Sequence, residues 1–394
     1  MNKNEISCLL NESLEPLSPS ALEFASLETA RKVERFHNSL PGYKPTPLVN
    51  LSQLARRLDV KNIFVKDESH RFDLNAFKVL GARYAIAKHL AEILGLKSDE
   101  LEFEKIIAHK TKYEKITFVT ATDGNHGRAV AWAAKLFGCK SVVYMPKGSS
   151  DARLNAILSY GAKASITKVN YDDTVNFAKK KAQEKSWVLL QDTSWERYEI
   201  VPQHIMQGYF TLVTEFLYQE RNAWPTHVFI QAGVGSLAAA LVAFFCNLED
   251  RPTPKFVIVE PQAAPCLYES SRRGNQNPFR VEGDLNTIMA GLACGEPSLK
   301  GWEILRATSS AFLTCSDNIA RKGMRVLGNP LRGDQPVISG ESGAVTLGAL
   351  FEVLSNKDYC KITSDLDLKN DSNVLLFSTE GDTDPEMYRE VVWR

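Results

Sequence analysis

One lysine stands where the sequence predicts the start of a helix. It ends the segment Asn75-Ala76-Phe77-Lys78, which follows an expected strand at 62–66 and a polar stretch at 67–73. A helix N-terminus and an ammonium group are both positive, so the pKa of such an amine can fall until the lysine is a nucleophile for an aldehyde. An exposed lysine without a chemical role would give the same pattern, so Lys78 needs support from other segments.

A glycine-rich segment lies between an expected strand and an expected helix. Gly233-Val234-Gly235-Ser236-Leu237-Ala238 directly follows the apolar run at 228–231. Glycines let backbone N–H groups approach an anion, and the helix N-terminus adds partial positive charge, so the segment predicts a phosphate site. It also fits G-x-G-x-x-A, and Glu260 ends the next expected strand, a pattern typical of dinucleotide binding in a dehydrogenase. A tight turn that binds nothing is the third interpretation.

A polar loop, Thr122-Asp123-Gly124-Asn125-His126-Gly127, joins another expected strand to another helix. Such a loop can offer N–H groups to a carboxylate and an amide side chain to a ring oxygen. Because Asp and Asn also favour helix N-caps, an ordinary capped turn explains this loop equally well when it is taken alone. Together, however, the three segments supply a Schiff-base lysine, a ring contact and a phosphate anchor, which pyridoxal phosphate requires. A nicotinamide dehydrogenase would leave two of the three unexplained.

The segments that must position these residues alternate in type. Short apolar runs predict buried strands, and the amphipathic stretches between them predict helices, which favours an α/β fold with mostly parallel sheets flanked by helices. The charged segment 96–115 is expected to be a surface insertion. The expected strands lie at 62–66, 117–120, 141–145, 164–169, 187–191, 228–231, 255–260, 311–315 and 374–377. The expected helices lie at 129–137, 151–159, 172–185, 204–219 and 237–248.

Composition excludes several classes of function. The 394 residues carry 47 Lys+Arg and 47 Asp+Glu, and this balance gives no general attraction to nucleic acid or anionic lipid. No apolar run reaches the roughly 20 residues that a bilayer requires, and no signal peptide is visible. The seven cysteines form no C-x-x-C pair and the seven histidines no H-E-x-x-H motif, so no metal site is expected. A cytoplasmic protein that acts on a small molecule is predicted.

Several longer motifs are similar to those of the fold-type II pyridoxal-phosphate enzymes, the tryptophan synthase β and threonine dehydratase group. The resemblance extends from about Tyr43 to the C-terminal end. Asp123 stands where dehydratases of hydroxy amino acids usually have Ser, and in this the chain resembles the diaminopropionate ammonia-lyase family. The motifs are FVKDES (64–69), NAFK (75–78), DGNHGR (123–128), YMPKG (144–148), QDTSWE (191–196), MQGY (206–209), MAGLACGEP (289–297), GESGAV (340–345) and FSTEGD (377–382).

The resemblance implies pyridoxal 5'-phosphate as the cofactor, held by Lys78. Asn125 is expected to contact the ring hydroxyl, and Phe77 to form an apolar wall against one ring face. Ser378 or Thr379 would face the pyridine nitrogen, and a neutral hydroxyl there makes the ring a weaker electron sink, which suits elimination. The residues expected around the phosphate are Gly233, Val234, Gly235, Ser236 and Leu237.

The resemblance also implies the reaction, an α,β-elimination of D- or L-2,3-diaminopropionate to pyruvate and ammonia. This substrate carries an additional cationic group, which the carboxylates of Asp123 and Asp192 could bind. Lys78 is expected to remove the Cα proton from one face, and Asp123 from the other face in the D-isomer. Asp192 could instead be a strand-end cap. The expected substrate-binding residues are Thr122, Asp123, Gly124 and Asp192.

Three alternative functions remain at this point: a serine/threonine dehydratase-like lyase, an NAD-binding dehydrogenase, and a regulatory protein that holds the cofactor without turnover. Asp73 and Arg83 occupy positions near the lysine where the family is expected to have smaller residues, which leaves the exact substrate open. We expect a large cofactor-binding domain from residues 1–80 and 200–394, and a smaller, mobile α/β domain from 81–199 that carries the asparagine loop. The family resemblance also predicts a homodimer.

Overall fold

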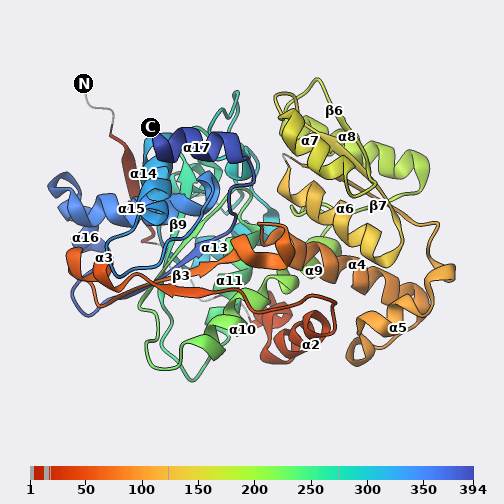
Figure 1. Ribbon diagram of the computed structural model, residues 1–394, viewed down its shortest axis with the longest axis horizontal. Helices are drawn as coiled ribbons and strands as arrows, with labels where there is room; N and C mark the ends of the chain where they lie inside the picture. The colour runs from red at the N-terminus through yellow and green to blue at the C-terminus, as the bar shows by residue number, and fades with distance from the viewer. Residues whose placement is uncertain (1–3, 13–16, 18, 123, 275) are drawn as a thin grey trace. The chain divides into compact units, whose positions relative to one another are not determined.

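The computed structural model describes residues 4–12, 17, 19–122, 124–274 and 276–394, which form two compact units (Figure 1). The first unit contains Met1–Glu23, Pro45–Ala76 and Glu215–Arg394, and the second contains Phe24–Lys44 and Phe77–Thr214. Each unit has its own sheet. The expected α/β architecture with mostly parallel sheets is confirmed.

The first unit contains a seven-stranded sheet in the order β1-β10-β9-β8-β11-β3-β2. The two outer strands, β1 and β2, pair antiparallel to their neighbours, and the five inner strands are parallel. All residues of β8 and β11 are buried, which is why they read as continuous apolar runs. The strands are β1 (Ile6–Leu10), β2 (Leu48–Asn50), β3 (Asn62–Asp67), β8 (His227–Gln231), β9 (Lys255–Pro261), β10 (Ser309–Cys315) and β11 (Asn373–Ser378).

Helices pack along this sheet, and two of them, α14 and α15, pack closely against each other. Small residues lie where these two helices meet, since a Cβ on Gly323 would collide with the backbone of Ala344. The α-helices of the first unit are α1 (Pro19–Leu22), α3 (Ser52–Arg57), α11 (Ser236–Cys246), α12 (Cys266–Arg272), α13 (Leu299–Thr308), α14 (Asp317–Gly328), α15 (Glu341–Ser355), α16 (Cys360–Leu366) and α17 (Pro385–Trp393). Its 3-10 turns are η2 (Glu68–Asp73), η5 (Ala290–Leu292) and η6 (Lys357–Tyr359).

The second unit contains a four-stranded parallel sheet in the order β6-β5-β4-β7. Its strands are β4 (Thr117–Ala121), β5 (Lys140–Met145), β6 (Lys163–Ile166) and β7 (Val188–Leu189). Its helices are α2 (Leu27–Asn38), α4 (Lys78–Leu94), α5 (Phe103–Ile107), α6 (Asn125–Phe137), α7 (Asp151–Leu158), α8 (Tyr171–Lys185) and α9 (Ile200–Gly208), with 3-10 turns η3 (Ser98–Glu100) and η4 (Lys110–Lys112). The 3-10 turn η1 (Glu23–Ala25) and helix α10 (Phe210–Gln219) contain boundaries between the units.

The boundaries of the second unit differ from the expected 81–199. Residues 24–44, 77–80 and 200–214 also belong to it, because α2 and α9 pack against α4. His37 of α2 contacts the Leu80 carbonyl oxygen through Nε2 at 3.2 Å. A Cβ on Gly208 would lie 2.6 Å from that same carbonyl oxygen, so only glycine allows this approach of α9. The mobility expected for this domain stays a prediction.

The nine expected strands all occur, with ends shifted by a few residues. The sequence analysis did not find β1 and β2, which are short strands at the two edges of their sheet. The expected helix at 204–219 is two helices that meet at Tyr209. The expectation for 96–115 is wrong in part, since Leu101, Phe103, Ile106 and Tyr113 are buried.

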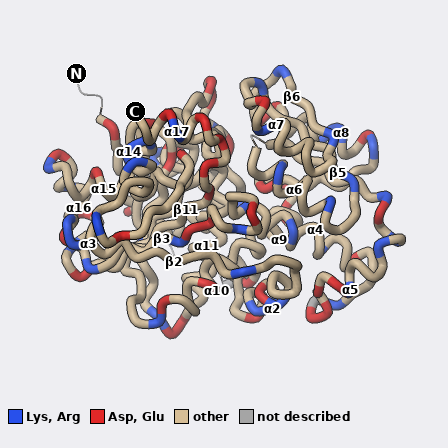
Figure 2. The backbone as a smooth tube through the Cα atoms, viewed as in Figure 1, with Lys and Arg blue, Asp and Glu red and all other residues tan. Residues whose placement is uncertain are grey.

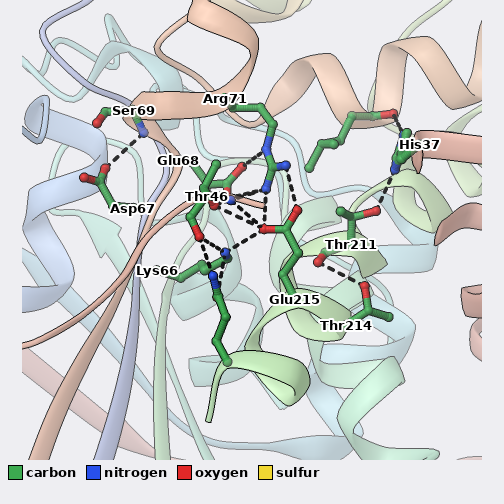
Figure 3. A network of polar contacts seen from close by, with 12 residues as sticks. His37, Thr46, Lys66, Asp67, Glu68, Ser69, Arg71, Thr211, Thr214 and Glu215 are labelled. Atoms are coloured by element: carbon green, nitrogen blue, oxygen red, sulfur yellow. Dashed lines mark hydrogen bonds and ion pairs between the residues drawn. The ribbon is translucent and has the colours of Figure 1, made fainter. Parts of the chain in front are cut away.

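Both signs of charge occur along the traced chain of each unit, in agreement with the zero net charge (Figure 2). One group of charges in the first unit is completely buried, and we call Lys66, Glu68, Arg71 and Glu215 the four-charge cluster (Figure 3). Arg71 Nη1 donates to Glu215 Oε1 at 2.7 Å, and its Nε donates to Glu68 Oε2 at 2.8 Å. Lys66 Nζ lies 2.6 Å from Glu215 Oε2. Two cations therefore balance two carboxylates inside the protein.

No helix in the described part of the chain is long and apolar enough to span a bilayer.

Candidate active site

The lysine of the sequence analysis begins a helix, as predicted. Lys78 is the first residue of α4, and its Nζ donates to Asp192 Oδ2 at 2.6 Å. The carboxylate is almost completely buried, whereas 18% of the lysine side chain remains exposed. The two residues are 114 positions apart in the sequence, so the fold of the second unit brings them together. The structure therefore joins two of the predicted catalytic residues in one ion pair.

His126 is a second side chain close to the same carboxylate. Its Nδ1 lies 3.7 Å from Asp192 Oδ2, and 2% of its side chain is exposed. Burial alone would raise the pKa of Asp192, but the nearby His126 and Lys78 together lower this pKa to about 2. Asp192 is consequently a carboxylate at every pH near neutrality. It could attract and orient a cationic group of a substrate.

Gln191 fixes the backbone next to Asp192. Its Oε1 accepts from Ala121 N at 3.0 Å, and its Nε2 donates to Ala121 O at 3.1 Å. These contacts tie Gln191, the second residue after β7, to the end of the neighbouring strand β4. The backbone N–H of Gln191 also donates to the Tyr198 hydroxyl at 2.9 Å. The side chain and the backbone of Gln191 thus fix the chain segment from which the Asp192 carboxylate extends.

The asparagine loop leads from β4 into α6, and Asn125 is the first residue of that helix. Thr122 caps the helix, because its Oγ1 accepts from Gly124 N at 2.9 Å and from Gly127 N at 3.1 Å. Gly124 has a φ of +154°, a conformation that side chains rarely adopt. Asp123 lies outside the described residues, so its predicted role as a base has no structural account. The substrate contacts expected of Thr122 and Gly124 stay predictions.

The glycine segment follows β8 in the first unit and leads into α11, which begins at Ser236. Gly235 has a φ of +94°, and a Cβ on Gly233 would lie 3.2 Å from both Gly291 O and Cys294 Sγ. The backbone at Gly235 favours glycine, a side chain at Gly233 would be tightly packed, and the loop brings backbone N–H groups to the start of an 11-residue helix. This backbone fits a phosphate group and so fits the phosphate of pyridoxal phosphate.

Glu260 argues against the dinucleotide interpretation of this segment. Its carboxylate is completely buried and accepts from the backbone N–H groups of Leu267 at 2.8 Å and Tyr268 at 2.7 Å. A dinucleotide fingerprint would need this carboxylate free for a ribose hydroxyl. In this chain the carboxylate instead stabilises the start of α12.

Ser378 ends β11 in the first unit, and Thr379 follows it; both side chains are buried. Gln231, at the end of the neighbouring strand β8, donates from Nε2 to Thr379 Oγ1 at 2.7 Å and to Phe377 O at 2.9 Å. Because the carbonyl oxygen can only accept, this second contact fixes the orientation of the Gln231 amide. Thr379 Oγ1 therefore accepts from Gln231, and its own hydrogen can be donated. Either hydroxyl has the chemistry expected for a contact with a pyridine nitrogen.

The other predicted residues near Lys78 have clear packing environments. Phe77 is buried, with its ring centroid 4.8 Å from that of Tyr209. Asp73 is exposed and has a φ of +56°, which explains why a glycine would be common at this position. Arg83 is fully buried, and its guanidinium stacks on the Trp132 ring, 3.2 Å from the centroid. Asp73 therefore faces water, and Arg83 takes part in the packing of α4 on α6.

His126 and Gln191 are the residues that the sequence analysis did not assign. Both stand within the polar motifs that were singled out, next to Asn125 and Asp192. Their position after the ends of the adjacent parallel strands β4 and β7 was the available signal. Side chains that follow such neighbouring strand ends meet at one edge of a sheet.

Comparisons with known proteins agree with this geometry. The family model described as "Pyridoxal-phosphate dependent enzyme" matches residues 40–375. The diaminopropionate ammonia-lyase of Salmonella typhimurium is 47% identical over 380 residues, which cover 95% of this chain and 94% of that relative. The biosynthetic L-threonine dehydratase of the same organism is 28% identical over 232 residues, which cover 58% of this chain and 38% of the dehydratase.

Comparison with solved structures finds the same group of proteins. The crystal structure of diaminopropionate ammonia lyase from Escherichia coli, in complex with an aminoacrylate-PLP azomethine reaction intermediate, superimposes with a TM-score of 0.90. The two chains are 46% identical, and the match covers 98% of this chain and 97% of the other. The likeness thus extends over nearly the whole of both chains.

Proposed function

This chain belongs to the pyridoxal-phosphate dependent enzymes and, within them, to the diaminopropionate ammonia-lyases, and we propose that it converts 2,3-diaminopropionate to pyruvate and two molecules of ammonia. The enzyme is a carbon–nitrogen lyase, and its cofactor is pyridoxal 5'-phosphate. The observation that carries the proposal is the contact of Lys78 with Asp192, 2.6 Å apart at the start of α4. This pair provides an amine for the cofactor's aldehyde and a carboxylate for a cationic substrate.

The following residues are proposed to hold the cofactor. Lys78 would bond to its aldehyde, Asn125 would contact its ring hydroxyl, and Phe77 would cover one face of the ring. Either Ser378 or Thr379 would donate a hydrogen bond to the pyridine nitrogen. When bound, the cofactor supplies an electron sink that acidifies the Cα proton of the amino acid. The loop residues proposed to bind its phosphate are Gly233, Val234, Gly235, Ser236 and Leu237.

In this proposal, side chains of the second unit remove the Cα proton and bind the cationic group of the substrate. The Lys78 amine, once freed by the incoming amino group, removes the Cα proton of one isomer. Asp123 removes the proton from the other face in the D-isomer. Asp192 binds the β-ammonium group, which holds the leaving group in its protonated form, ready to depart as ammonia. Loss of this ammonia followed by hydrolysis of the remaining imine gives pyruvate and a second ammonia.

Two measurements test the proposal directly. The purified holoenzyme should be yellow, and borohydride reduction followed by peptide mass spectrometry should locate the cofactor label on Lys78. Pyruvate release from 2,3-diaminopropionate, coupled to lactate dehydrogenase, should exceed release of pyruvate from serine or of 2-oxobutyrate from threonine. A label on another lysine would refute the assignment of Lys78, and faster release from serine or threonine would refute the substrate.

The Asp123 proposal has a stereochemical test. The Asp123→Asn variant should lose turnover of the D-isomer and keep that of the L-isomer. If the L-isomer were lost and the D-isomer kept, the assignment of the two faces would be reversed.

Assembly and location are also part of the proposal. We expect a homodimer in the cytoplasm, as the family resemblance implies. Light scattering during size-exclusion chromatography gives the mass, and a value near the 44.0 kDa of one chain would contradict the dimer.

A further inference from the structure

His126 is a buried imidazole whose two nitrogens face different acceptors. It lies in the first turn of α6, and its Nε2 is 2.8 Å from the carbonyl oxygen of Leu190. A carbonyl oxygen can only accept, so Nε2 carries a hydrogen. The other nitrogen, Nδ1, lies 3.7 Å from Asp192 Oδ2. The negative charge of Asp192 therefore acts on the protonation of Nδ1.

A carboxylate in this position favours a proton on Nδ1. A neutral ring would turn the Nδ1 lone pair toward a negative oxygen, whereas an imidazolium turns an N–H group toward it. Only 2% of the histidine side chain and 6% of the aspartate side chain are exposed, so water screens their interaction poorly. Burial opposes each charge taken alone, and the two charges therefore stabilise each other as a pair.

Lys78 is the second cation on Asp192, and its availability changes with the cofactor. It contacts the same oxygen, Oδ2, at 2.6 Å. Under the proposed function, the Lys78 nitrogen is bonded to the cofactor's aldehyde in the resting holoenzyme and is no longer a free ammonium. We propose that protonated His126 is a positioning residue that keeps Asp192 ionised in the holoenzyme. The carboxylate is then ready to bind the β-ammonium group of the substrate.

The other groups around this pair do not replace His126. The phenols of Tyr198 and Tyr209 are buried, and burial raises the pKa of both, so they stay neutral near pH 7. Asp123 lies outside the described residues. The cations that lower the pKa of Asp192 are His126 and Lys78, and the guanidinium groups on the packed helices are not among them. These guanidinium groups belong to Arg83 on α4, Arg128 on α6 and Arg153 on α7.

The protonation of His126 can be measured without turnover. Holoenzyme containing 15N-labelled histidine should show both ring nitrogens of His126 protonated at pH 7, with the signals assigned by their loss in a His126→Gln variant. An unprotonated Nδ1 at pH 7 would overturn the inference. This inference rests on the proposed function, but the two fail differently. A colourless chain that releases no pyruvate refutes the function, whereas a yellow, active enzyme with a neutral His126 refutes the inference alone.

Kinetics provide the second test, with His37 as a matched control. His37 is equally buried, and its Nε2 faces the Leu80 carbonyl at 3.2 Å, but its Nδ1 contacts Thr211 Oγ1 instead of a carboxylate. His126→Gln should move the acid limb of the kcat/KM profile for 2,3-diaminopropionate upward by at least about one pH unit, a roughly tenfold loss on that limb. His37→Gln should leave the limb unchanged. An unmoved limb in His126→Gln would overturn the inference, and if that variant does not fold, His126→Asn supplies both the assignment of the spectrum and the pH profile.

Discussion

Two buried groups of charged side chains, one in each unit, differ in how completely their members are enclosed. In the four-charge cluster, two cations meet two carboxylates, and the Arg71 guanidinium contacts both Glu68 and Glu215 (Figure 3). In the second unit the carboxylate of Asp192 lies near both Lys78 and His126. The side chains of the first group are buried, whereas 18% of the Lys78 side chain in the second group is exposed.

This difference separates a structural role from a chemical one. The members of the four-charge cluster also bond to Thr46, whose N–H donates to Glu215 Oε2 and whose hydroxyl donates to Glu68 Oε1. Every charge there has fixed partners, so a reaction would have to break several contacts at once. Lys78 is partly exposed, and its amine can leave Asp192 to bond to an aldehyde. The partly exposed group is consequently the one that can take part in catalysis.

Removing the amine should have the largest effect. We expect Lys78→Ala to lower kcat for 2,3-diaminopropionate by at least about 10⁴-fold, because it removes both the nucleophile and the base. The coupled pyruvate assay measures this loss, and far-ultraviolet circular dichroism should show an unchanged fold. A variant that kept a tenth of the wild-type rate would show that another group performs the chemistry.

Breaking the balanced cluster should act on stability. Glu215→Gln leaves Lys66 and Arg71 with insufficient negative charge in the interior, and we expect a loss of about 3–5 kcal/mol in the free energy of unfolding. Denaturant titration measures this loss. The same substitution in the exposed Lys181–Glu184 ion pair, Glu184→Gln, is the control and should leave the unfolding midpoint unchanged. Equal midpoints for the two variants would contradict the structural role of the cluster.

The same carboxylate predicts sensitivity to acid. Burial alone would raise the pKa of Glu215, but Arg71 and Lys66 lower it from 4.5 to about 2. A lowered folded-state pKa contributes stability above the unfolded value, and this stability is lost as the pH falls from about 4.5 toward 2. Unfolding free energies measured across this range should fall more steeply for the wild type than for Glu215→Gln. Parallel curves would mean that Glu215 does not titrate in this way.

Weakening the group around Asp192 should mainly reduce turnover of the diamine. Asp192→Asn keeps the size of the side chain but removes the charge that attracts the β-ammonium group. We expect kcat/KM for 2,3-diaminopropionate to fall on the order of a hundredfold, which corresponds to loss of a charge-assisted hydrogen bond in a buried site. Release of pyruvate from serine, which has no β-ammonium group, should fall less. An equal loss for both substrates would count against the proposed contact.

Glu260 is a third buried acidic side chain, and its substitution should have the smallest effect of those considered. Glu260 forms no ion pair within the described part of the chain, and burial raises its pKa to about 8, so it holds a proton at neutral pH. Glu260→Gln replaces a neutral acid by a neutral amide whose NH2 group cannot accept from one of the two backbone N–H groups, and we expect a loss of about 1–2 kcal/mol in the free energy of unfolding at pH 7. A loss comparable to that of Glu215→Gln would show that Glu260 is ionised.

The elements that could be predicted from sequence are those whose signal is local. Inner strands such as β8 are buried on both faces, so their residues form apolar runs. The edge strand β2 has three residues and one buried side chain, which is too short a pattern to be recognised. The insertion at 96–115 contains many charges, and its buried Phe103 becomes understandable through its ring contact with Phe137, 5.6 Å away in α6.

The residues of the site also divide into those with a local signal in the sequence and those without one. Lys78, Asn125 and the glycine segment have local signatures, namely a helix start and a strand–turn–helix sequence. The roles of His126 and Gln191 depend on partners far along the chain, such as the carbonyl of Ala121, 70 residues before Gln191. Spacing does not reveal such partners, because they depend on the pairing of β4 with β7. The match of charges around Asp192 therefore became visible only with the tertiary structure.

The place of β11 in its sheet has a consequence for the order in which the chain can fold during synthesis. This strand comes last along the chain among the described strands, yet it lies between β8 and β3 and pairs with both. The second unit is complete once residue 214 has left the ribosome, but the first sheet stays in two pieces until residue 378 has emerged. Until then the nascent chain exposes unpaired edges at β8 and β3, the kind of surface that leads to aggregation. Translation of the final segment thus joins two half-sheets that chaperones would have to keep apart from other chains.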